Sequence, residues 1–61
     1  MTVKELMRHI DGCFKILITE KDKKTEVVSV NDKWEIPEDL EKEMVSDWIC
    51  CEKRVKIALD R

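Results

Sequence analysis

Four residues of this sequence have side chains suited to metal binding or nucleophilic chemistry: Cys13, Cys50, Cys51 and His9. Together they have the ligand types of a Cys₃His zinc site. Their spacing argues against one, because neighbours such as Cys50 and Cys51 point to opposite faces of a strand and no Cys-x-x-Cys motif is present. We therefore expect no metal and no cofactor, with the thiols acting as small hydrophobic side chains.

A catalytic Cys–His pair would require His9 and Cys13 to meet across one helical turn and a glycine bend. No feature of the sequence indicates an oxyanion hole beside them. An exposed histidine is the simpler interpretation. We assign no catalytic residue, and an enzyme is less favoured than either a protein-binding or a nucleic-acid-binding module.

Charged residues gather in three short segments. The first is acidic and could meet a basic partner, although acids at the start of a helix also suit its dipole. The other two are basic turns that could contact phosphates if both fell at the same end of a sheet. The acidic segment holds Glu35, Glu38, Asp39, Glu41, Glu43 and Asp47, and the basic turns hold Lys21, Lys23, Lys24, Lys53, Arg54 and Lys56.

Composition limits the compartment and the partners. With 43% of residues charged and a net charge of −2, the chain carries both signs in a mixture that favours solubility and gives no overall attraction for nucleic acid or an anionic membrane. Three cysteines leave at least one unpaired in a monomer, which argues for a reduced compartment. No apolar run approaches a membrane span and no signal-peptide pattern is present, so we expect a cytoplasmic protein without membrane contact.

The spacing of apolar residues predicts one α+β domain over residues 1–61. Residues 2–11 form a helix with a Thr2–Glu5 capping box and Gly12 after its end. Residues 13–20 and 25–31 alternate as two strands of a hairpin, but the turn sequence does not fix its register. A loop of odd length, which gives the fuller core, places Val28 and Val30 beside Ile18 and Ile16. A short helix follows Pro37 over residues 37–43. The expected architecture is a four-stranded, mostly antiparallel sheet, with one N-terminal helix and one short helix between the hairpins.

Residues 44–50 and 54–60 form the second predicted hairpin. A loop of two or four residues sets Trp48 opposite Ile57, Cys50 opposite Val55 and Ser46 opposite Leu59, and residues directly opposite share a face. Trp48 then enters the core. A loop of three residues would instead expose it.

One helix of about ten residues can cover only one face of such a sheet. Apolar residues pointing away from the helix indicate an association surface. We expect this surface to bind another protein and to pair two copies of the chain as a homodimer. Its predicted residues are Leu17, Val27, Val45 and Ile49, with Ala58 beside them.

The chain also resembles a family of very small proteins encoded by phages and other mobile elements of Firmicutes. The resemblance rests on the opening Thr-Val-Lys-Glu-Leu, on Ile-Asp-Gly, on Lys-Ile-Leu-Ile, and on Ile-Pro-Glu-Asp-Leu followed by Val-Ser. The chain departs from the family around Trp34, where the family has a simpler turn. The resemblance implies a mobile-element accessory protein that acts by protein binding, for example an anti-CRISPR-like inhibitor of a host defence system.

The alternative function is a nucleic-acid-binding module that uses the two basic turns. Trp34, or an exposed Trp48, would then supply the aromatic surface on which bases stack. The two functions differ in their response to salt, because phosphate contacts weaken steeply with ionic strength and apolar contacts do not.

Overall fold

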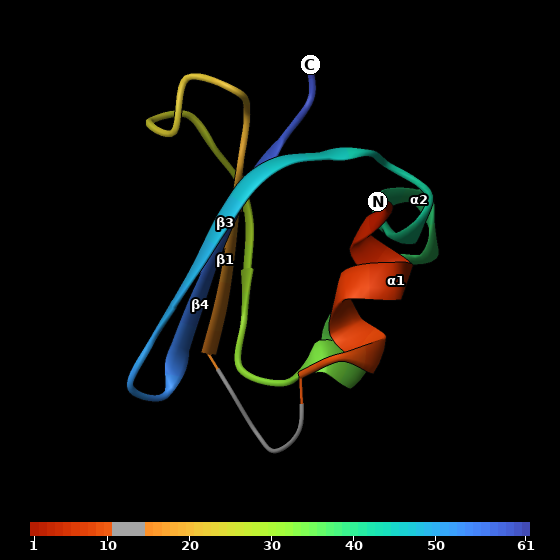
Figure 1. Ribbon diagram of the computed structural model, residues 1–61, viewed down its shortest axis with the longest axis vertical. Helices are drawn as coiled ribbons and strands as arrows, with labels where there is room; N and C mark the ends of the chain where they lie inside the picture. The colour runs from red at the N-terminus through yellow and green to blue at the C-terminus, as the bar shows by residue number, and fades with distance from the viewer. Residues whose placement is uncertain (11–14) are drawn as a thin grey trace.

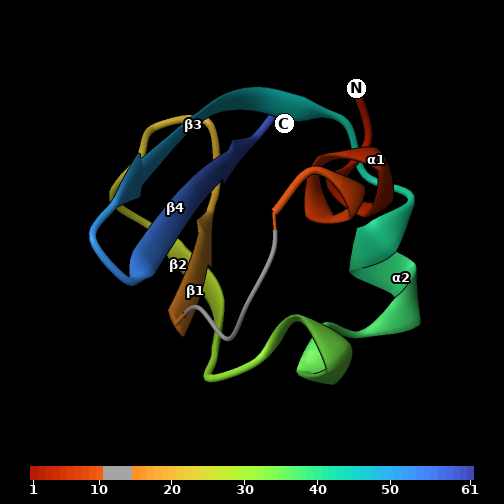
Figure 2. The same ribbon diagram turned by 60° about the horizontal axis from the view of Figure 1, so that its bottom comes forward.

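Four strands form one sheet, and the described helical segments all lie on one of its faces (Figures 1 and 2). The computed structural model describes residues 1–10 and 15–61, and the predicted Gly12 helix end and the start of the first strand at Cys13 and Phe14 lie outside them. The helical segments are α1 (Val3–Arg8), the 3₁₀ helix η1 (Lys33–Glu35) and α2 (Glu38–Glu41). The strands are β1 (Lys15–Thr19), β2 (Glu26–Val30), β3 (Val45–Cys51) and β4 (Arg54–Leu59).

The strand order is β2-β1-β4-β3, so each hairpin contributes one edge strand and one central strand. The hairpins β1–β2 and β3–β4 are antiparallel, whereas the central strands β1 and β4 run parallel. The chain between the hairpins contains η1 and α2 and crosses the same face that α1 covers (Figure 2). The predicted α+β class, with a mostly antiparallel sheet, is confirmed.

Helix α1 begins at the predicted capping box. The Glu5 amide donates to the Thr2 hydroxyl at 3.2 Å, and the Thr2 amide donates to the Glu5 carboxylate at 3.0 Å. These two bonds satisfy N–H groups that the first turn of a helix would otherwise leave unpaired. The helix is shorter than predicted, because it ends at Arg8 with His9 as its C-cap.

Backbone hydrogen bonds hold α1 in place over the sheet. The Val3 amide donates to the Glu43 carbonyl at 3.0 Å, and the Val45 amide donates to the Met1 carbonyl at 2.8 Å. The segment before β3 thereby fixes the start of α1, and the stripe predicted at helical spacing faces the sheet. Its members Val3, Leu6, Met7 and Ile10 are all buried.

The register of the first hairpin confirms the prediction, with Ile16 opposite Val30 and Ile18 opposite Val28. These side chains form the core with the central strand β4 and with Ile36, and burying each large aliphatic side chain contributes roughly 1.5–3 kcal/mol. The sheet residues of the core are Ile16, Ile18, Val30, Val55, Ile57 and Leu59.

Among the described residues, no helix has the length and apolar character needed to cross a membrane.

The predicted register of the second hairpin is correct near its turn and wrong at the opposite end of its strands. Trp48 pairs with Ile57 and Cys50 with Val55, as a two-residue loop requires. An irregularity between Val45 and Asp47 then shifts the register, so Val45 rather than Ser46 lies opposite Leu59. A bulge of this kind adds a residue to one strand and moves the following side chains to the other face.

Trp48 shares the face of the core, but the prediction that it is buried there is wrong. It is 44% exposed. The reason is its position on β3, which is an edge strand, whereas the fully buried Ile57 opposite it lies on the central strand β4.

Candidate functional site

The sheet face opposite the helices is left uncovered by every described segment of the chain (Figure 1). We call it the open face and define it by Lys15, Leu17, Ile49, Arg54 and Lys56. Pairing across the strands places Lys15 beside Arg54, and Lys56 between Leu17 and Ile49. Ile49 is 60% exposed and Leu17 is half-buried. The open face therefore has two apolar side chains with a lysine between them.

The cations of the open face have no ion pair within the described residues. The salt bridges among the described residues join other side chains. The charges of Lys15, Arg54 and Lys56 are therefore available to a partner. Glu26 and Glu52 line shallow hollows at two margins of the same face. Three cations with two aliphatic side chains favour a ligand that offers carboxylates around an apolar contact.

Two of the four predicted interaction residues do not lie on the open face. Val27 is the extra residue where the β1–β2 register shifts between Ile18 and Thr19, and it packs against the core. Val45 also packs against the core, because the bulge in β3 sets it opposite Leu59. The prediction that these two side chains point away from the helix is therefore wrong.

The apolar residues of the open face are Leu17 and Ile49, and the predicted Ala58 lies on the same side of the sheet. Ala58 is only 5% exposed, and so offers little surface to a partner. Thr19 beside it is 6% exposed, and its hydroxyl donates to the Glu20 carbonyl at 3.0 Å. The apolar area available for association is thus smaller than the sequence predicts.

The two basic turns lie at opposite ends of the sheet. Because β1 and β4 are parallel, the turn that follows β1 and the turn that precedes β4 are separated by the full strand length (Figure 1). The condition for one continuous basic edge is therefore not met. In the first turn, Lys23 pairs with Asp47 at 2.7 Å and Lys21 with Asp60 at 3.3 Å. In the second turn, Arg54 and Lys56 belong instead to the open face.

The predicted acidic patch is divided among four places. Glu35 lies in η1, and Glu38, Asp39 and Glu41 lie in α2. Glu43 pairs with Arg61 at 3.0 Å, and Asp47 pairs with Lys23 on the sheet. These six residues therefore do not form one negative surface, and the acids of α2 stand in its first turn, where they suit the positive end of the helix dipole.

Two exposed aspartates have a lowered pKa because they accept hydrogen bonds. The Asp22 carboxylate accepts from the Thr25 and Lys24 amides and the Thr25 hydroxyl, which lowers its pKa and closes the first turn. The hydrogen bond from Lys23, followed by that from the Trp48 amide, lowers the pKa of Asp47. Both carboxylates serve the fold, and neither is available as a proton donor near neutral pH.

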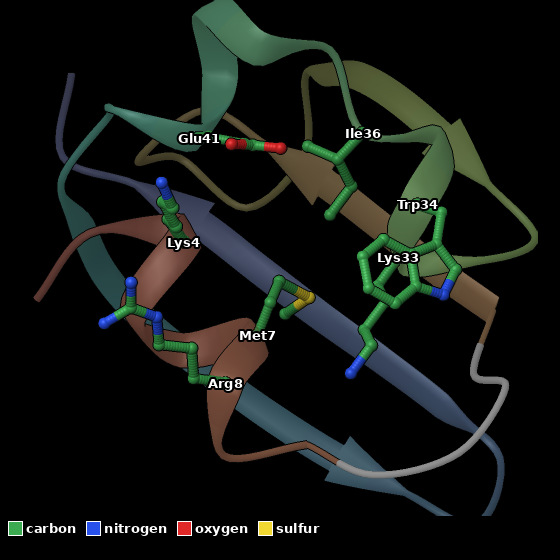
Figure 3. Close-up of a pocket in the computed structure, with 7 residues that line it drawn as sticks. All are labelled: Lys4, Met7, Arg8, Lys33, Trp34, Ile36 and Glu41. Atoms are coloured by element: carbon green, nitrogen blue, oxygen red, sulfur yellow. The ribbon is translucent and has the colours of Figure 1, made fainter.

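A second candidate site lies on the helical side of the molecule (Figure 3). It is a pocket of about 280 Å³ between α1 and the segment that contains η1 and α2. We call it the Trp34 pocket. The sequence indicated Trp34 as a surface for base stacking and as the place where the chain departs from the family. No local pattern reveals that residues 33–41 pack beside α1. Its lining residues are Lys4, Met7, Arg8, Lys33, Trp34, Ile36 and Glu41.

The candidate metal ligands are not brought together in the described chain. Cys50 lies opposite Val55 and Cys51 opposite Arg54, so the two thiols point to different faces, and both are exposed. Residues 1–10 and 15–61 contain no group of three or more side chains placed to hold a metal ion. Cys13 lies outside these residues, and exposed His9 ends α1.

No family model matches the sequence, and comparisons with curated proteins and with solved structures gave no significant match. The open face and the Trp34 pocket are the two candidate sites on which the proposals below are built.

Proposed function

We propose that this protein is a small interaction module that binds an acidic segment of another protein through its open face. The observation that carries the proposal is the uncovered sheet surface, where Lys56 lies between Leu17 and Ile49. A side chain exposed on a sheet is usually polar, so a 60% exposed isoleucine among cations supports a contact surface.

The charges of the open face support an acidic partner. Lys15, Arg54 and Lys56 have no ion pair among the described residues, while the carboxylates Glu26 and Glu52 stand at the margins. A partner that placed an apolar side chain against Ile49 and carboxylates around it would satisfy both features. Electrostatic attraction would also speed its association.

The biological setting proposed for this binding comes from the sequence resemblance. A phage or mobile-element accessory protein of 61 residues would act by occupying a surface of a larger protein. Inhibition of a host defence system, as by anti-CRISPR proteins, is one such role. The cytoplasm is the compartment proposed with it.

The experiment compares two matched charge reversals. The tagged chain captures proteins from a lysate of its native host, and mass spectrometry identifies those retained. Lys56→Glu reverses the centre of the open face, and Lys24→Glu makes the same change in the first turn, beyond the Thr19–Ala58 end of the sheet. The purified partner should bind the Lys56→Glu variant at least about tenfold more weakly than the wild-type chain, and the Lys24→Glu variant as tightly as wild type. Equal binding by both variants would refute the proposal, as would capture of nothing that depends on the open face.

A second copy of the chain is the competing occupant of the open face. Pairing through a two-fold axis would bring two Lys56 ammonium groups near each other at its centre, which like charges oppose. The packing of Val27 and Val45 against the core also removes half of the apolar set that argued for pairing. The homodimer thus stays a prediction that sedimentation decides. A species of 7.3 kDa across the micromolar range favours the partner protein, and a species of twice that mass, lost in Ile49→Lys, favours the dimer.

A further inference from the structure

The Trp34 pocket combines an exposed aromatic ring, an apolar floor and several cations. Trp34 is 82% exposed, although the pocket beside it is floored by Met7 and Ile36, which are buried. Figure 3 shows the indole on one side of the pocket and the side chains of Lys4 and Arg8 on the other. An aromatic wall faces positive charge across a space that no described residue fills.

Two contacts hold the segment that carries the indole in place. The Asp32 carboxylate accepts from the Trp34 amide at 3.1 Å, which caps η1. The Lys33 ammonium lies 5.4 Å from the centre of the indole ring and donates to the Ile10 carbonyl at 3.2 Å. This lysine ties η1 to the end of α1 and occupies one side of the ring. Because Trp34 is 82% exposed, the indole keeps free surface on which a base can stack.

Charge and size restrict the ligand. The pocket is lined by three cations, Lys4, Arg8 and Lys33, and by one carboxylate, Glu41, and none of them has an ion pair among the described residues. Lys4 and Arg8 are one helical turn apart on α1, so both can reach one anion. A volume of about 280 Å³ lies just below the ~300–1,000 Å³ range of most small-molecule pockets, so the space suits one ring system with its substituent.

We propose that the Trp34 pocket binds a nucleotide, with the base stacked on Trp34 and the phosphate held by Lys4 and Arg8. A base on an aromatic side chain and a phosphate on lysine and arginine are the two contacts by which nucleotides of single strands are held. The Glu41 carboxylate at the rim can accept a hydrogen bond from an amino group of the base. An acidic peptide would use the cations but would leave the indole uncovered.

The test follows the two indole N–H resonances in a ¹⁵N-labelled sample of the full chain, because the chain has two tryptophans. The probe is adenosine monophosphate. We expect the resonance of Trp34 to shift and to saturate below about 1 mM, while that of Trp48, on the far edge of the sheet, stays in place. Adenosine should bind at least about fivefold more weakly, because it lacks the phosphate contact.

Two variants test the assigned roles. Lys4→Gln should weaken binding of adenosine monophosphate severalfold and leave binding of adenosine unchanged, whereas Lys24→Gln, in the first turn, should change neither. Trp34→Leu should abolish binding without unfolding the chain, because the indole is 82% exposed. The Lys56→Glu variant, changed on the open face, should bind the nucleotide as the wild-type chain does. The proposal for the Trp34 pocket and the proposal for the open face are thereby tested independently.

The sources of the nucleotide are distinguished by comparing the mononucleotide with a short single strand of deoxyadenosine. Tighter binding of the strand, with the same Trp34 shift, assigns the pocket to single-stranded nucleic acid, and equal binding assigns it to the free nucleotide. The proposal would be overturned if the Trp34 resonance did not move or if both tryptophan resonances shifted equally. It would also be overturned by equal affinity for adenosine and its monophosphate, or by stronger binding of a hexaglutamate peptide.

Discussion

The two faces of the sheet are built from the same strands and differ in almost every physical respect. On the covered face, Ile16, Ile18 and Ile57 are at most 1% exposed and pack under α1. On the open face, the next residues along the same strands include Leu17 and Lys56, and the apolar side chains are separated by charge. Because the helices cover only one face, the side chains that point to that face form the core and those that point to the other face do not.

This difference separates what holds the fold from what is available to a ligand. The centre of the covered face is closed by α1, whose start is bonded to the segment before β3, and its exposed surface lies at the edge strand, as at Trp48. The open face contributes little burial of its own and keeps three cations without ion pairs among the described residues. Mutations should therefore affect stability on the covered face and binding on the open face.

The largest effect is expected from shortening an isoleucine on the covered face. Ile57→Ala removes a 1% exposed side chain from the middle of a central strand and should cost about 2–5 kcal/mol. The core of a domain this small rarely supplies more than about 3–5 kcal/mol of stability. The variant should be largely unfolded by circular dichroism at 25 °C.

The matched control is the same substitution on the open face. Ile49→Ala removes a side chain that is 60% exposed, and surface changes of this kind usually alter stability by less than about 0.5 kcal/mol. Urea denaturation should give a midpoint close to that of the wild-type chain. A large loss in Ile49→Ala would mean that the open face is covered in solution, as in a dimer.

An intermediate effect is expected at Trp48, which lies at the border between the two faces. Complete burial would make Trp48→Ala cost about 3–5 kcal/mol. Because the indole is 44% exposed on an edge strand, we expect roughly half of that, about 2 kcal/mol. The shift of the urea midpoint measures it, and a completely unfolded variant would show that the indole is buried after all.

Periodicity predicted the covered face well, because both the helix stripe and the hairpin pairing depend on local spacing. The capping box, the buried stripe of α1 and the pairing of Ile18 with Val28 all follow from residues close in sequence or opposite in a hairpin. The predicted register of the second hairpin was correct from Cys50 to Trp48, because the loop length fixes the pairing next to the turn.

The open face was predicted less well, because bulges and strand order leave no periodic pattern. The register shifts at Val27 and Val45 each turn one valine toward the core. The parallel pairing of β1 with β4, which separates the two basic turns, joins segments that are far apart in the sequence. The Trp34 pocket depends on α1 and η1 packing together, which no residue spacing predicts.

The smallest effect concerns α1, the helix that lies over the covered face. Hydrogen bonds from Thr2, first from its amide and then from its hydroxyl, lower the pKa of Glu5 below its ordinary value of 4.5. A lowered pKa in the folded chain means that the charged carboxylate favours folding. Its contribution is fully present above pH 4.5 and is lost as the pH falls through the lower pKa of the folded state.

Glu5→Gln tests this contribution, because the amide oxygen can still accept from Thr2 but no longer titrates. The wild-type chain should be slightly more stable than Glu5→Gln at pH 7, and the difference should shrink toward pH 3. Asp22 and Asp47 also have lowered pKa values and titrate in both proteins, so the difference between the two urea curves isolates Glu5. Glu38→Gln, at an exposed position in the first turn of α2, is the matched control. A pH-independent difference between wild type and Glu5→Gln would mean that the capping box does not depend on charge, and that α1 is held over the covered face by its packing and its backbone bonds to Glu43 and Met1 alone.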